Sequence, residues 1–190
     1  MLQKFARMAY KGKVIRNPKT GQEIKFLQTC ADTDGALLEL QSTYHVSSSE
    51  PPLHLHPLQE ELFTLEAGEL TVRINGITRV LTKGEPLRVK ENTPHAMWNA
   101  STGDTVVNWK VLPALNTEYF LETIMGLAVD GKTDKIGRPS IFQIALLSKK
   151  YSNVFRLAKP AYAIQKIIFS LLAPFAYVSG YRSDYKKYFS

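Results

Sequence analysis

Three of the four histidines fall in two short segments, and they are the residues best suited to metal chemistry. His54 and His56 are separated by one residue, so on an extended strand their imidazoles point to the same face and can approach one ion together. Glu61 and His95 can complete the set with a carboxylate oxygen and a third imidazole nitrogen. Such a donor set leaves one or two coordination positions for water, oxygen or substrate. The sequence therefore predicts a mononuclear metal site.

Three histidines and one carboxylate suit Fe(II), Mn(II), Ni(II), Cu(II) or Zn(II). We therefore expect one divalent transition metal, whose identity depends on what the cell supplies. Glu60 cannot share the histidine face with Glu61, because successive side chains of a strand alternate. Glu60 is then either a solvated residue or a second carboxylate near the mouth of the site, where it would be the candidate catalytic acid or base.

Phe63, Met97 and Trp109 are expected to line a pocket beside the ion, where aromatic walls would suit a planar or aliphatic organic ligand. Packing in the core explains these three residues equally well. Alternation places Met97 on the same face as His95, which favours a position in the pocket. His45, the remaining histidine, is expected at the surface or at the end of a strand.

The elements that must position these residues are short strands. Turn signals separate segments of alternating pattern, and Asn75-Gly76 is the strongest hairpin signal in the chain. The expected strands cover residues 23–30, 36–46, 62–66, 69–74, 77–81, 86–90, 96–99 and 105–112. Many short strands with no helix between them predict a sandwich or a closed barrel.

The pattern changes after Pro113, where helices are predicted at residues 117–130, 141–150 and 161–177, the last interrupted by Pro174. We therefore divide the chain into two parts. Residues 1–113 are expected to form a barrel with a basic N-terminal arm, and the barrel itself begins at about residue 12. Residues 114–190 are expected to form an apolar and basic helical tail.

The net charge of +7 is concentrated at the two ends of the chain. Residues 1–20 hold six Lys or Arg and no acid, and residues 141–190 hold eight against the single acid Asp184. The middle is mildly acidic, so the high pI does not indicate a nucleic-acid face. The single cysteine, Cys30, excludes an internal disulfide, and the first residues lack a secretory signal. We expect a cytoplasmic protein without a nucleic-acid partner.

Residues 161–180 are about as long and nearly as apolar as a bilayer span, and three alternatives remain open. The segment could pack on the barrel or on a second copy in a homodimer, as a helix apolar all round usually does. It could lie in a membrane interface, so that residues 161–190 make a peripheral membrane contact. It could also span the membrane, although Gln165, Lys166 and Pro174 disfavour this.

The segment from Pro52 to Gly68, PLHLHPLQEELFTLEAG, resembles the first motif of the cupin superfamily. A second motif follows in Gly84, Asn92, Pro94-His95 and Asn99, and the resemblance spans about residues 45–112. It implies a mainly β fold, a cupin double-stranded β-helix (jelly-roll) barrel with the metal inside, to which the tail adds a C-terminal helical extension. The closest functional analogy is to quercetin-dioxygenase-like cupins.

The resemblance implies that four residues, which match the ligand positions of the family motifs, bind the metal: His54, His56, Glu61 and His95. It gives Gly68 and Gly84 the roles of turn glycines and Asn99 a structural role. The chain departs from the first motif at Ser48, where glycine is usual. It departs from the second motif at Lys90 and Asn92, where proline and glycine are usual. Asparagine tolerates left-handed backbone, so the turn at Asn92 is expected to persist.

The expected function is that of a metallocupin that acts on or binds a small organic molecule, most directly a dioxygenase-type oxidoreductase. A non-catalytic binding or sensing module is an alternative, in which the metal orients a ligand without turnover. A metal-dependent isomerase would use the same ligands without consuming oxygen. No general base stands out beyond Glu60, which favours the binding module slightly over catalysis.

Overall fold

The computed structural model describes residues 9–45 and 48–189. The first eight residues of the expected basic arm, together with Val46 and Ser47 at the end of the second expected strand, lie outside the described residues. The strands are β1 (Val14–Arg16), β2 (Glu23–Gln28), β3 (Leu38–Tyr44), β4 (His54–Leu55), β5 (Glu60–Ala67), β6 (Leu70–Ile74), β7 (Ile77–Leu81), β8 (Pro86–Val89), β9 (His95–Trp98), β10 (Thr105–Leu112) and β11 (Arg156–Leu157).

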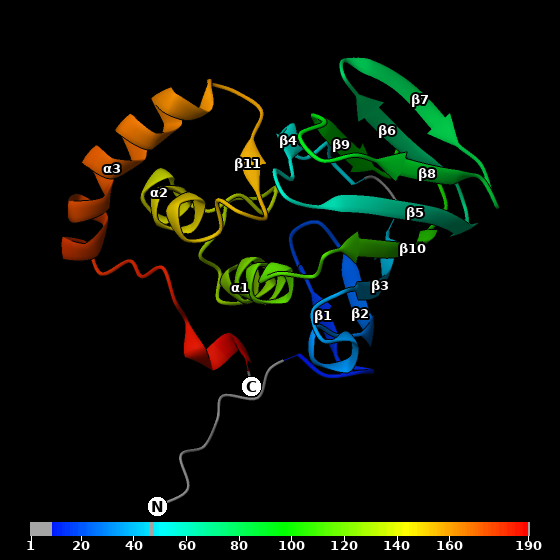
Figure 1. The fold of residues 1–190 in the computed structure, drawn as a ribbon, viewed down its shortest axis with the longest axis horizontal. Helices are drawn as coiled ribbons and strands as arrows, with labels where there is room; N and C mark the ends of the chain where they lie inside the picture. The colour runs from blue at the N-terminus through cyan, green and yellow to red at the C-terminus, as the bar shows by residue number, and fades with distance from the viewer. Residues whose placement is uncertain (1–8, 46–47, 190) are drawn as a thin grey trace, which may run out of the picture.

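The strands form two antiparallel sheets (Figure 1). One has six strands in the order β1-β2-β3-β10-β5-β8, and the other has five in the order β11-β4-β9-β6-β7. A buried apolar cluster joins them, with Phe63, Leu65 and Val107 from the first sheet and Val72 and Met97 from the second. Alternation along each strand turns these side chains inward. The fold is the expected mainly β jelly-roll barrel with helices at the C-terminal end.

The eight strands expected from the sequence all occur, with ends that differ by a few residues. Asn75 and Gly76 both have positive φ, as the two-residue hairpin between β6 and β7 requires. Asn92 also has positive φ, so the predicted left-handed turn is present without glycine. The strands β1 and β11 were not in the predicted set, because two or three residues are too short to show an alternating pattern. Strand β4 was anticipated only as the extended segment that carries His54 and His56.

The helices are α1 (Thr117–Val129), α2 (Ile141–Lys150) and α3 (Tyr162–Val178), and two short 3-10 helices occupy η1 (Ala31–Thr33) and η2 (Lys186–Phe189). Helix α1 is held against the barrel by polar contacts. Lys13 Nζ lies 2.6 Å from Glu122 Oε1, and Glu118 Oε2 accepts a hydrogen bond of 3.0 Å from the backbone N–H of Cys30. The buried Gln59 amide donates to the carbonyl oxygen of Pro113 just before the helix.

The chain returns to the barrel after α2. Strand β11 pairs with β4, with Arg156 opposite Leu55 and Leu157 opposite His54. In Figure 1, α2 lies between the barrel and α3, and α3 is the outermost layer on that side. The predicted boundary between the barrel and the helical tail, at residue 113, stays a prediction. Residues beyond this boundary supply one strand of the five-stranded sheet. The three alternatives for residues 161–180 do not concern β11; within that segment, α3 packs against α2.

Candidate metal centre

Three imidazoles and one carboxylate converge between the two sheets. Nitrogen atoms of His54, His56 and His95 all lie within 4.8 Å of one another. His54 and His95 are direct partners across β4 and β9, which brings their side chains together. Glu61 reaches in from β5, with its Oε2 atom 3.0 Å from His95 Nε2 and 3.3 Å from His56 Nε2. The structure thus gathers all four residues that the sequence predicted as ligands.

Hydrogen bonds to the backbone fix the tautomer of each imidazole. The Nδ1 atom of His54 lies 3.0 Å from the carbonyl oxygen of Pro52, and that of His95 lies 2.9 Å from the carbonyl oxygen of Thr93. His56 Nδ1 makes the same kind of contact with the carbonyl oxygen of Val154. A carbonyl only accepts, so Nδ1 carries the proton in each ring and the Nε2 lone pair remains available for a metal.

The spacing and burial of these atoms fit a transition-metal ion. Within the described part of the chain, His56 Nε2 and Glu61 Oε2 are buried and have no hydrogen-bond partner. A buried polar atom without a partner costs about 1–3 kcal/mol, so such atoms call for an occupant. Two donors bound to one ion at about 2.0–2.2 Å and at right angles lie about 3 Å apart. The separations of Glu61 from His56 and His95 match this value.

The electrostatics of the cluster favour the metal-binding protonation state for His54, His56 and Glu61, but not for His95. Burial, together with the other two imidazoles, lowers the pKa of His54 to about 3, and burial also lowers the pKa of His56. Burial by itself would raise the pKa of Glu61, but the three imidazoles bring it down to about 2. Burial opposes the charged form of His95, and its contact with Glu61 nevertheless raises its pKa. Neutral imidazoles and an ionised carboxylate are the forms that act as ligands.

Glu60 does not join this cluster. Its Oε2 atom accepts hydrogen bonds of 2.8 and 2.6 Å from Arg88 Nε and Nη2 on the outer face of the sheet. Alternation along β5 turns Glu60 outward because it turns Glu61 inward. The geometry therefore gives no support to Glu60 as the catalytic acid or base. His45 follows β3, is exposed, and has Nδ1 2.9 Å from Asp104 Oδ2.

The metal cluster opens into a chamber of about 700 Å³. Phe63, Met97 and Trp109, the expected pocket residues, lie along its barrel side. The helical tail supplies much of the facing wall, through Phe120, Leu121, Ile124, Ile144, Leu147 and Phe155. The chamber is thus bounded jointly by the barrel and the tail, and its walls are largely apolar.

Two residues of the tail touch the metal cluster and were not anticipated from the sequence. The Phe155 ring stacks on His54, with centroids 4.9 Å apart and planes 23° apart. It also stacks on Phe120 of α1, at 4.9 Å and 28°. Its neighbour Val154 supplies the carbonyl that orients His56. Both lie in a segment without a motif, so no sequence signal links them to the histidines.

Trp109 holds the carboxylate in place, and its replacement by phenylalanine is expected to weaken metal binding about 10- to 100-fold. Its Nε1–H donates a hydrogen bond of 3.0 Å to Glu61 Oε1, while its ring stacks on Phe63 at 5.9 Å. Trp109→Phe removes the hydrogen bond and keeps an aromatic ring. Competitive metal titration measures the effect. Trp98→Phe, at the other tryptophan, is the matched control, and equal affinities of the two variants would contradict the assignment.

Comparison with known proteins shows which proteins this chain resembles. Residues 41–111 match the family model described as a cupin domain. Oxidoreductase iacF of Pestalotiopsis fici is 31% identical over 112 residues, covering 55% of this chain and 54% of that protein. The chain thus spans about half the length of this curated relative. Probable oxidoreductase virH of Hypocrea virens is 27% identical over 153 residues, covering 74% of this chain and 68% of that protein.

Solved structures with the same kind of barrel were also found. An RmlC-like cupin from Shewanella frigidimarina has a TM-score of 0.47 and 17% identity, covering 58% of this chain and 93% of that one. A predicted oxalate decarboxylase from Thermotoga maritima has a TM-score of 0.47 and 19% identity, covering 53% of this chain and 90% of that one. The family-model match coincides with the jelly-roll strands and with all four residues of the metal cluster. This chain therefore carries a cupin domain at residues 41–111.

Proposed function

We propose that this protein is a metal-dependent cupin oxidoreductase of the dioxygenase type that acts on an apolar organic molecule. The observation that carries the proposal is the convergence of His54, His56, His95 and Glu61 at one end of a largely apolar chamber. A transition metal held by these residues would supply oxygen activation or polarisation of the substrate. The oxidoreductase names of the two fungal relatives support the same class of reaction.

The chamber favours a substrate with a substantial apolar body. Its volume of about 700 Å³ lies within the range of about 300–1,000 Å³ that is usual for pockets that bind organic ligands. Phe63 and Met97 on one side and Phe120 and Phe155 on the other exclude water and offer apolar contact area. A planar or aliphatic molecule would gain from burial against these walls, whereas a small sugar would leave much of the chamber unfilled.

Tyr44 is the chamber residue best suited to orient a polar group of the substrate. It ends β3 and lines the chamber. Burial raises the pKa of its phenol to about 12, and the negative charge of Glu61 acts in the same direction. The phenol therefore keeps its proton at neutral pH and can donate a hydrogen bond to a substrate oxygen.

Tyr44→Phe is accordingly expected to leave the metal content unchanged and to lower turnover or substrate affinity about three- to tenfold, the effect of one lost hydrogen bond. Metal analysis and steady-state kinetics on the same preparation separate the two effects. Thr43→Ala, which changes the adjacent residue of β3 on the opposite face of the strand, is the control for a general disturbance of the strand. Loss of metal from Tyr44→Phe would show that Tyr44 supports the ligands instead of the substrate.

A non-catalytic binding module is the second candidate, and one observation favours it over an isomerase. Among the described residues that line the chamber, Glu61 and Glu50 are the only carboxylates, and Glu50 Oε1 lies 3.2 Å from Arg73 Nε. The chamber therefore offers no unpaired carboxylate as a general base. This counts against an isomerase that moves a proton between carbon atoms, but it is compatible with oxidation at a metal and with binding alone.

Oxygen uptake distinguishes the candidates. The purified protein would be tested with flavonoids, diketones and other apolar, enolisable compounds, after a thermal-shift screen selects those that stabilise it. The proposal expects oxygen consumption with a stabilising compound, and loss of that consumption in His54→Ala. Stabilisation without oxygen uptake or product would support a binding module. Formation of an isomer without oxygen uptake would support an isomerase, and either result would overturn the proposal.

A further inference from the structure

Helix α3 has a buried face and an exposed face that are both apolar. On the buried face, Ala173 and Ala176 pack against Leu146 of α2, and Phe169 is also buried. Gln165, on the same face, donates to the carbonyl oxygens of Leu157 and Pro160 at the start of the helix. Helix α3 is therefore attached to the rest of the molecule along one side, and its other side is its outer surface (Figure 1).

The exposed face forms a continuous apolar stripe along the whole helix. Its members recur at intervals of three and four residues, the spacing that aligns side chains along one side of a helix. Their exposed fractions run from 40% to 91%. The stripe consists of Ile164, Ile167, Ile168, Leu171, Phe175 and Val178. Six large apolar side chains on one exposed helix face are more than scattered surface residues, so they indicate a binding surface.

The charges around this stripe are almost all positive. Helix α3 contains no acid, and Asp184, the single acid of residues 141–190, lies 3.0 Å from Lys150 Nζ. Lys159 precedes the helix, Lys166 lies within it, and Arg182 follows it. The surface therefore combines an apolar stripe with a positive surround.

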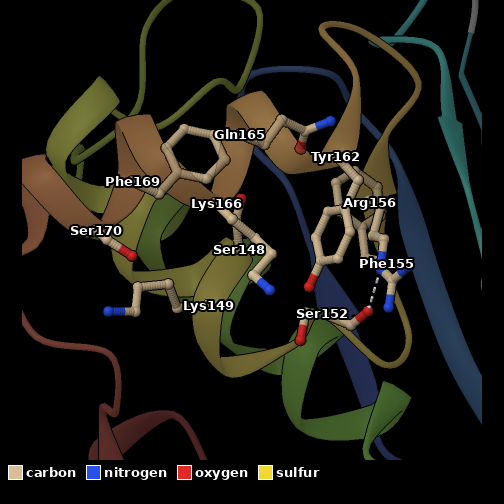
Figure 2. Close-up of a pocket in the computed structure, with 10 residues that line it drawn as sticks. All are labelled: Ser148, Lys149, Ser152, Phe155, Arg156, Tyr162, Gln165, Lys166, Phe169 and Ser170. Atoms are coloured by element: carbon tan, nitrogen blue, oxygen red, sulfur yellow. Dashed lines mark hydrogen bonds between the residues drawn. The ribbon is translucent and has the colours of Figure 1, made fainter.

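One flank of α3 borders a small hollow of about 190 Å³ between α2, β11 and α3, and positively charged side chains line this hollow (Figure 2). Lys149, Arg156 and Lys166 line it together with three serines. Arg156 lies over the Tyr162 ring, 3.9 Å from its centroid, and its Nε donates to the carbonyl oxygen of Ser152. The positive charge thus extends from the ends of the helix along this side.

An anionic lipid surface fits these features better than a second copy of the chain. Two copies docked through this face would bring their cations together, which is unfavourable. Lipid headgroups would supply the opposite charge, and the acyl region would take up the stripe. No helix in the described part of the chain has the length and apolar character to cross a bilayer.

We propose that the exposed face of α3 is a peripheral membrane-binding surface, which lies parallel to the bilayer with its stripe in the interface and its cations at anionic headgroups. Leu157 and Lys159, just before α3, also line the chamber of the metal site. The proposed surface therefore adjoins the chamber, which would let an apolar substrate enter from lipid; this last step rests on the proposed function.

Vesicle cosedimentation of the full chain tests the proposal. Binding to vesicles of phosphatidylglycerol and phosphatidylcholine is expected at low salt, with a decrease as salt rises and weaker binding to phosphatidylcholine alone. The double variant Leu171→Glu/Phe175→Glu is expected to bind at least about tenfold more weakly, because it places charge in the stripe. Lys159→Gln/Lys166→Gln should lower affinity about fivefold for each cation removed.

Ile77→Glu on β7 is the matched control. Ile77 is 73% exposed, comparable with Leu171 at 67%, but belongs to the barrel. The Ile77→Glu variant should bind vesicles as the wild type does, and circular dichroism should show that all variants are folded. Absence of binding to anionic vesicles at low salt would overturn the proposal, as would equal binding of the stripe variant. Dimerisation of the wild type that the stripe variant abolishes, without vesicle binding, would assign the surface to a second copy instead.

Discussion

Replacing His56 by alanine is expected to lower metal affinity by at least about 100-fold and to leave the far-UV circular dichroism close to that of the wild type. His56 offers a buried Nε2 atom with no hydrogen-bond partner among the described residues, and its Nδ1 atom is already held by Val154. Loss of a ligand should cost at least as much as loss of a supporting contact, which typically costs 10- to 100-fold. Its side chain belongs to none of the apolar core clusters, so the barrel should persist.

His45→Ala is the control for this experiment, because it removes an imidazole that is exposed and paired with Asp104. Its metal affinity should equal that of the wild type in a competitive titration. If His56→Ala kept the affinity of the wild type, His56 would have to be removed from the ligand set. Equal losses in both variants would point to binding of metal at the surface instead of the proposed centre.

Truncation after Gly131 is expected to leave a barrel that binds metal about 10- to 100-fold more weakly and exposes apolar surface. The shortened chain keeps the two clusters that fill the barrel, but it loses the Val154 carbonyl and the Phe155 ring. It also uncovers Leu127, which packs against residues of α2 and the segment after it. Metal titration and the fluorescence of an apolar dye measure the two effects.

Truncation after Lys159 is the comparison that isolates these contacts. It removes α3 but keeps α2, β11, Val154 and Phe155, so its metal affinity should lie much closer to that of the full chain. If the chain cut after Gly131 bound metal as tightly as the full chain, the tail would be an appendage without a role at the site. If both truncated chains lost metal equally, the contribution would come from α3.

The barrel and the ligands were predictable because their signals are local or lie at fixed spacing. His54 and His56 share a face through simple alternation, and the pairing of β4 with β9 then places His95 beside them. Alternation also separates Glu60 from Glu61, and the spacing of the motif selected Glu61 for the histidine face, where the structure places it. The alternation follows from strand geometry alone, whereas the place of His95 beside the other two histidines was expected from the spacing of the cupin-like motifs.

The contribution of the tail could not be predicted in the same way. Strand β11 is two residues long, and the contacts of Val154 and Phe155 join positions about one hundred residues apart in the chain. Such contacts depend on how α1 and α2 pack, which the helical pattern alone does not determine. The sequence also left open how the apolar stretch at residues 161–180 is used. In the structure, Phe169 and Ala173 are buried, whereas Ile167 and Leu171 remain exposed.

The metal content of the purified protein is the decisive test of the proposed metal centre. The protein would be purified without chelator or nickel affinity resin and analysed for metals, alongside His54→Ala and His56→Ala. We expect close to one transition-metal ion per chain in the wild type and little in either variant. A wild-type protein without bound transition metal, which also gains no thermal stability when Fe(II), Mn(II), Ni(II), Cu(II) or Zn(II) is added, would contradict it.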